Sequence, residues 1–104
     1  MTFPSAVTVG PVTFTIQPDH ALTNATQCWG HIDYARQAIT IDPVGGDDHI
    51  AVTVLHELLH AHFHLGGIGD RDNGEQTITK LSPLLLDTLR RNPGLVAYLI
   101  GGEA

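Results

Sequence analysis

The chain of 104 residues is long enough for one compact domain, and its 42% hydrophobic and 15% charged residues are ordinary for a soluble globular protein. Its 11 acidic and 5 basic residues give a formal net charge of -6, which argues against a nucleic-acid partner, because phosphate binding needs clustered Lys and Arg. A single cysteine, Cys28, excludes an internal disulfide and favours a reducing, cytoplasmic setting. We expect no secretory signal. We also expect no membrane span, because no apolar stretch approaches the roughly 20 residues that a span needs.

The first part of the chain shows the two-residue alternation that is typical of β-strands. Residues 5–16 alternate apolar and polar side chains on both sides of Gly10-Pro11, which predicts a strand pair or one bent strand. Residues 17–27 are polar and turn-like, with room for a short helical turn. Residues 28–34 and 37–42 predict two further strands joined by a hairpin connection.

A long helix is predicted after the strands. Residues 42–46 read Asp-Pro-Val-Gly-Gly and interrupt regular structure, and Asp47 or Asp48 is a suitable N-cap. The helix should extend to Leu65, where Gly66-Gly67 ends it. Apolar residues cover most of its circumference, which predicts that the helix is largely buried.

Two more helices are predicted in the last third of the chain. One begins near residues 73–75 and ends at Arg91, with a kink or a break near Leu81 because Pro83 falls inside the pattern. A short helix over 94–100 follows Pro93. The whole pattern predicts a single α+β domain over residues 1–104, with a small sheet packed on helices.

The long helix carries the motif His56-Glu57-Leu58-Leu59-His60. His56 and His60 are four residues apart, so their imidazoles share one helical face and two ring nitrogens can meet one zinc ion. Glu57 lies about 100° around the helix, so it is placed to hold the metal-bound water and take its proton rather than to bind the metal. Zinc would bring the pKa of that water close to neutral, which makes a nucleophile available.

The surroundings of the motif favour this function over a chance pattern. Val54, Leu55, Leu58 and Leu59 leave little room for a solvated face, which is the alternative reading of a histidine-rich helix. Three ionisable groups on such an apolar helix would cost several kcal/mol without a role such as metal binding.

A catalytic zinc site usually has a third protein ligand, and the sequence leaves several candidates. Glu75, fifteen residues after His60, opens the next helix and is the preferred one, although an acidic residue is also favourable there for the helix dipole alone. Asp70 and Asp72 lie in the intervening loop. His64 is one turn beyond His60, but a rigid helix would place it too far to share the ion with both other histidines.

Other polar residues are candidates for a transition-state donor. His31, Tyr34 and Tyr98 could each support a developing oxyanion, and nothing in the sequence favours one of them. His20 and His49 are read as surface or helix-start residues.

These features resemble a known family. The motif over 56–60, followed by Glu75 at the head of the next helix, resembles the gluzincin arrangement of zinc metallopeptidases. The strands over 30–33 and 38–41 before the zinc helix are similar to those of minigluzincins and of phage and bacterial metallopeptidase-like proteins of the ImmA/IrrE type. The resemblance implies a zincin-like fold, a Zn2+ cofactor held by the two histidines and Glu75, Glu57 as general base, and a peptide or protein substrate added to the sheet edge.

The chain departs from related patterns. Phe63 and Gly66 stand where metzincins have a glycine and a third histidine, and no histidine follows His64. A separate C-terminal subdomain like that of the larger gluzincins is also not expected within these 104 residues. An alternative is therefore a non-catalytic, zinc-stabilised regulatory or assembly protein that binds a peptide or protein partner. A third hypothesis is that residues 1–16 cover the cleft and keep a peptidase latent.

Overall fold

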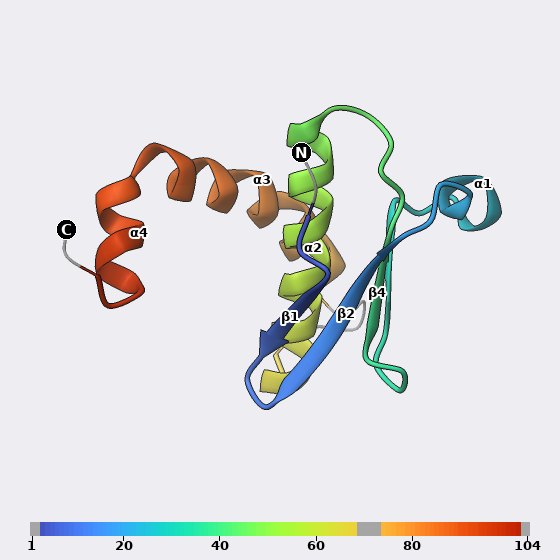
Figure 1. Cartoon of the computed structure of the whole chain (residues 1–104), viewed down its shortest axis with the longest axis horizontal. Helices are drawn as coiled ribbons and strands as arrows, with labels where there is room; N and C mark the ends of the chain where they lie inside the picture. The colour runs from blue at the N-terminus through green and yellow to red at the C-terminus, as the bar shows by residue number, and fades with distance from the viewer. Residues whose placement is uncertain (1–2, 69–73, 103–104) are drawn as a thin grey trace.

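The computed structural model describes residues 3–68 and 74–102, and it shows a sheet packed on one side of a long central helix (Figure 1). The chain order is β1 (Ala6–Val9), β2 (Val12–Pro18), α1 (Leu22–Thr26), β3 (Gly30–Asp33), β4 (Ala38–Ile41), α2 (Asp47–Gly66), α3 (Glu75–Arg91) and α4 (Pro93–Leu99). This mixed four-stranded sheet with helices α2 and α3 confirms the predicted α+β class.

The strands lie in the order β1-β2-β4-β3, so β3 forms one edge of the sheet. The alternating segment around Gly10 is a strand pair, in which β1 and β2 are antiparallel and Gly10 turns the chain with a φ of 56°. Strands β2 and β4 are parallel, whereas β3 and β4 are antiparallel. Strand β4 thus lies between β2 and β3. The edge strand β3 contacts helix α2.

The core lies between the sheet and α2. The predicted alternation is present in β2, where Phe14 and Ile16 are buried and Thr15 between them is exposed. Ile39 and Ile41 of β4 are fully buried beside them, and Ala61 of α2 closes the cluster from the helix side. These aliphatic and aromatic side chains provide most of the apolar burial that holds α2 against the sheet.

Helix α2 differs in two respects from the prediction. Its N-cap is Gly46, and Asp47 and Asp48 both lie in the first turn, where their charge still favours the helix dipole. The expectation of a largely buried helix is also wrong, because most of its apolar side chains are half-buried and Leu65 is 40% exposed. Its fully buried ridge is Thr53, Glu57 and Ala61, one residue per turn facing the sheet. Its end is as predicted, with Gly67 in the left-handed conformation.

Of the kink or break predicted near Leu81, the break does not occur, because helix α3 continues through Pro83. The hydroxyl of buried Ser82 donates to the Ile78 carbonyl oxygen, which adds a bond in the turn where Pro83 lacks an N–H. Asn92-Pro93 then starts the short helix α4, as predicted. Helices α3 and α4 extend away from the sheet (Figure 1) and give the chain its long dimension of 44 Å. Within the described residues, every helix is too short or too polar to cross a membrane.

Candidate metal centre

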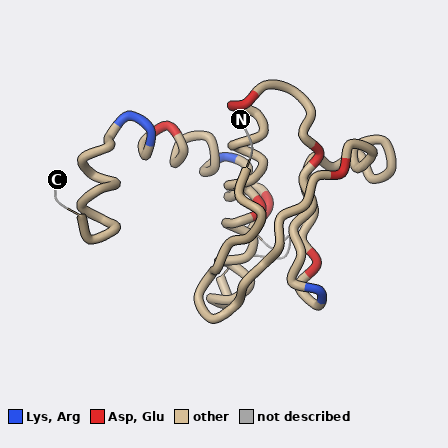
Figure 2. The backbone as a smooth tube through the Cα atoms, in the orientation of Figure 1, with Lys and Arg blue, Asp and Glu red and all other residues tan. Residues whose placement is uncertain are grey.

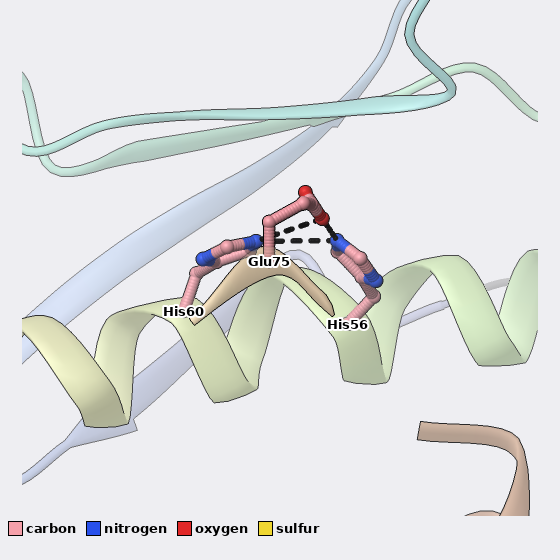
Figure 3. A group of neighbouring side chains, drawn as sticks. All are labelled: His56, His60 and Glu75. Atoms are coloured by element: carbon pink, nitrogen blue, oxygen red, sulfur yellow. Dashed lines mark hydrogen bonds and ion pairs between the residues drawn. The ribbon is translucent and has the colours of Figure 1, made fainter. Parts of the chain in front are cut away.

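Three potential ligands meet between helices α2 and α3. His56 and His60 project from one face of α2, and Glu75 approaches them from the first turn of α3 (Figure 3). His56 Nε2 lies 3.2 Å from His60 Nε2 and 2.6 Å from Glu75 Oε1, and His60 Nε2 lies 3.3 Å from the same oxygen. The predicted pair of histidines thus shares one environment, and Glu75 is the carboxylate that joins it.

The distances between these atoms fit a single small cation. Donor atoms that bind one zinc ion tetrahedrally at about 2.0–2.1 Å lie about 3.3 Å from one another. Two of the three donor separations, from His60 to His56 and to Glu75, are 3.2 and 3.3 Å. The third is the 2.6 Å contact of a carboxylate with a ring nitrogen. The group could therefore hold a metal ion with little movement of its side chains.

The local sequence explains why Glu75 reaches the histidines. Gly74, the N-cap of α3, adopts a φ of 74°, a backbone conformation that residues other than glycine rarely adopt. A Cβ atom at Gly74 would also lie 2.6 Å from the ring of Phe63, so the chain passes close against α2 at this point. Glu75 follows directly, and its carboxylate lies over the helix face that carries His56 and His60.

Burial favours the form of the candidate ligand His56 that metals bind. Desolvation lowers the pKa of His56, the neighbouring His60 lowers it further, and the negative charge of Glu75 partly opposes both effects. Since the ring is only about 20% exposed, the neutral imidazole with a free ring lone pair is favoured near neutral pH.

Glu57 lies next to the three ligands but does not join them. Its carboxylate is buried, and its Oε2 atom is 4.0 Å from His56 Nε2. It packs against Gly30 of the edge strand, where any Cβ atom would lie 2.9 Å from the Glu57 Cγ and Oε2 atoms. Burial, followed by the charge of Glu75, raises the pKa of Glu57 to about 7. A carboxyl group with such a pKa can both accept and release a proton near neutral pH.

The other ligand candidates lie elsewhere or outside the described residues. The ring of His64 stacks on Tyr34, with 3.8 Å between the ring centroids, so His64 does not join the metal group. Asp70 and Asp72 lie outside the described residues. Tyr34, the residue after β3, donates a hydrogen bond of 3.2 Å to the carbonyl oxygen of His60. This bond links the end of β3 to helix α2.

An open cavity of about 670 Å³ surrounds the metal group, between the edge strand β3 and helices α2 and α3. Of the three candidates for an oxyanion donor, His31 and Tyr34 line it, whereas Tyr98 lies on α4 and does not. Strand β1 forms the edge of the sheet opposite β3, and β2 lies next to β1. No residue from 3 to 16 lines the cavity, so the hypothesis that this segment covers the cleft is wrong for the described residues.

Sequence reasoning missed three residues that shape this cavity. Gly30 makes room for the Glu57 carboxylate, and Trp29 and His49 form one end of the cavity with their rings in contact. His49 could have been noticed, because it is two helical turns before His56 and therefore on nearly the same face. Gly30 and Trp29 carry no signal in the sequence, since their roles depend on how β3 meets α2.

No protein-family model matches the chain, and no curated protein or solved structure matches it either. The interpretation of the centre therefore rests on its own residues and distances. These describe a possible metal site of His56, His60 and Glu75, with the buried carboxyl group of Glu57 beside it at the floor of an open cavity.

Proposed function

We propose that the protein is a zinc-dependent peptidase that uses Glu57 as its general base. The observation that carries the proposal is the buried Glu57 carboxyl group, whose Oε2 atom lies 4.0 Å from His56 Nε2 and which lines the open cavity beside the candidate ligands. A purely structural metal site would need the three ligands but would gain nothing from a fourth, buried carboxyl group that is costly to ionise.

The donor set favours zinc over magnesium and calcium, because two imidazoles and one carboxylate are softer than an all-oxygen site. Three protein ligands also leave a fourth position for water or substrate, as in catalytic zinc sites. When bound, zinc would polarise the substrate carbonyl and make water acidic enough to react near neutral pH. His56, His60 and Glu75 would hold the ion.

The edge strand supplies a place for an extended substrate. Strand β3 pairs with β4 along only one side, and it borders the cavity that contains the candidate ligands. An extended peptide could pair with its free side through backbone hydrogen bonds. Gly30 at the start of β3 keeps the peptide path close to Glu57, because no side chain separates the strand from that carboxylate.

In the proposed reaction the oxygen of a water molecule attacks the peptide carbonyl carbon. The Glu57 carboxylate accepts the proton that this water loses and then donates it to the leaving amine nitrogen as the C–N bond breaks. His31 or Tyr34, which both line the cavity, are candidates for a donor to the developing oxyanion. The products are a carboxylic acid and an amine, which at neutral pH become a carboxylate and an ammonium group by transfer of the remaining water proton, and Glu57 returns to its starting state.

The test is a comparison of the wild-type protein with Glu57→Gln and Asp87→Asn after loading with zinc. A mixture of unstructured peptides serves as substrate, and mass spectrometry detects new termini. We expect cleavage by the wild type and by Asp87→Asn, which removes an exposed carboxylate of α3. Glu57→Gln should keep one zinc ion per chain and lose at least about a hundredfold in rate.

Cleavage, zinc content and the melting temperature after chelation together distinguish the two functions considered. Cleavage by Glu57→Gln at the wild-type rate would refute the assignment of the base. If the wild type holds zinc, melts at a lower temperature after chelation and cleaves nothing in the mixture, the non-catalytic, zinc-stabilised binding protein is the better description.

A further inference from the structure

One end of the cavity is a wall of aromatic and apolar side chains that the proposed reaction does not use. The rings of Trp29 and His49 meet edge to face, with 4.4 Å between their centroids and 84° between their planes. Val52 of α2 and Pro83 of α3 also line the cavity. Trp29 is nevertheless 54% exposed, so its ring offers apolar surface to a molecule that enters the cavity.

This wall lies at the distance of a neighbouring substrate residue. Val52 and His49 precede His56 by four and seven residues on α2, so they lie about 6 and 10 Å from it along the helix axis. One residue of an extended chain spans about 3.3 Å, and side chains on the same side repeat every second residue, at about 6.6 Å. A peptide with its scissile bond at the candidate metal group would therefore place a nearby side chain against this wall.

The wall is held in place by the surrounding backbone. The carbonyl oxygen of Trp29 accepts a 2.8 Å hydrogen bond from the backbone N–H of Asp42. Gly45 adopts a φ of 80° and passes so close to His49 that a Cβ atom there would lie 3.1 Å from the ring. His49 is thus confined between Trp29 and Gly45, and little ordering is needed when a ligand binds.

The charges around the cavity disfavour an acidic side chain at this wall. Figure 2 shows the basic residues of the described chain on α3 and in the turn between β3 and β4. None of the described residues that line the cavity is Lys or Arg, and the two carboxylates among them, Glu57 and Glu75, lie at the candidate metal group. An acidic substrate side chain would be left without a partner, and an apolar one would bury surface against the rings.

We infer that Trp29, His49 and Val52 form a specificity subsite for an aromatic or other large apolar side chain of a peptide, next to the scissile bond. The inference rests on the proposed peptidase function, because a ligand anchored at the metal group is what places a side chain here. Trp29 and His49 determine specificity in this view, and they take no part in the bond-breaking step.

Trp29 is the sole tryptophan of the chain, so its fluorescence reports directly on the subsite. The experiment titrates the zinc-loaded protein with phenylalanine hydroxamate and with glycine hydroxamate, which differ by one benzyl group. We expect the benzyl compound to bind at least tenfold more tightly and to change the Trp29 emission, whereas the glycine compound leaves the emission nearly constant.

Matched variants test the wall itself, with calorimetry as the readout. Trp29→Ala should reduce the preference for the benzyl compound to about twofold or less, because most of the ring contact is removed. Tyr98→Ala, which removes an exposed aromatic ring of α4, should leave the preference unchanged. A preserved preference in Trp29→Ala, equal affinities for the two hydroxamates in the wild type, or binding of neither would each overturn the subsite.

Failure of the peptidase proposal is measured separately: the wild type would hold no zinc or cleave nothing, or Glu57→Gln would cleave at the wild-type rate. A protein that cleaves peptides through Glu57 but binds both hydroxamates equally would retain the proposed function and lose the subsite. A protein that prefers the benzyl compound but cleaves nothing would retain the subsite as part of a binding site.

Discussion

The buried carboxyl group of Glu57 should make the metal-free protein less stable as the pH rises. Its pKa is raised from 4.5 to about 7, first by burial and then by the charge of Glu75. Between these two values the folded state keeps the proton and the unfolded state loses it. Because the folded state then binds more protons, stability falls with increasing pH across this window.

The size of the effect follows from the two pKa values of Glu57. Their difference corresponds to about 3 kcal/mol, fully present as stability below pH 4.5 and lost once the pH exceeds about 7. Glutamine has nearly the same shape as glutamate and no charge. Glu57→Gln should therefore gain up to about 3 kcal/mol relative to the wild type between pH 4.5 and pH 8.

Urea unfolding in the presence of a chelator measures this difference, with Trp29 emission as the probe. The free energy of unfolding is obtained for the wild type, Glu57→Gln and Asp87→Asn at several pH values across the window. Both variants keep all the other ionisable groups of the wild type, so the result is taken as the difference between each variant and the wild type. If the free energies of unfolding of the wild type and Glu57→Gln change with pH in parallel, the carboxyl group is not buried in the way described.

Two further predictions concern the metal and the edge strand. Zinc at a hundred times its dissociation constant should stabilise the protein by about 2.7 kcal/mol, seen as a rise in Tm of roughly 10 °C or more that His60→Ala abolishes; an equal rise in both proteins would contradict the ligand assignment. Gly30→Ala should cost about 1–3 kcal/mol in urea unfolding and reduce cleavage at least tenfold, because its Cβ would lie 2.9 Å from Glu57 atoms. Gly94→Ala, with no atom within 4 Å of the added Cβ, should be neutral or slightly stabilising, and equal losses in the two variants would exclude the close packing.

Local patterns in the sequence predicted the elements and the metal group. The alternation of Phe14 and Ile16 follows from the two faces of a strand, and the meeting of His56 with His60 follows from the pitch of a helix. Glu75 was preferred because an antiparallel helix could aim it at the histidines, and it does lie there. The strand alternation and the histidine pair depend on neighbours within one or two turns of the chain, whereas the position of Glu75 depends on how α3 packs against α2.

Features that depend on distant contacts were not predictable. The parallel pairing of β2 with β4 brings Ile16 beside Ile39 across a separation in which α1 and β3 intervene. The burial of α2 was overestimated because the sheet covers only the ridge that includes Thr53 and Glu57. Gly46 rather than Asp47 caps α2, since the cap is set by how the preceding loop turns.

The left-handed glycine before α3 has a consequence for how the site can vary. Gly74 is fixed both by its φ of 74° and by the Phe63 ring 2.6 Å from where a Cβ would be, so it sets the rotational phase of α3. Inserting one residue between Gly74 and Glu75 would swing the carboxylate about 100° around the helix axis, away from the histidines. Sequences that diverge from this one must therefore preserve the Gly74-Glu75 dipeptide to keep the carboxylate beside the histidines.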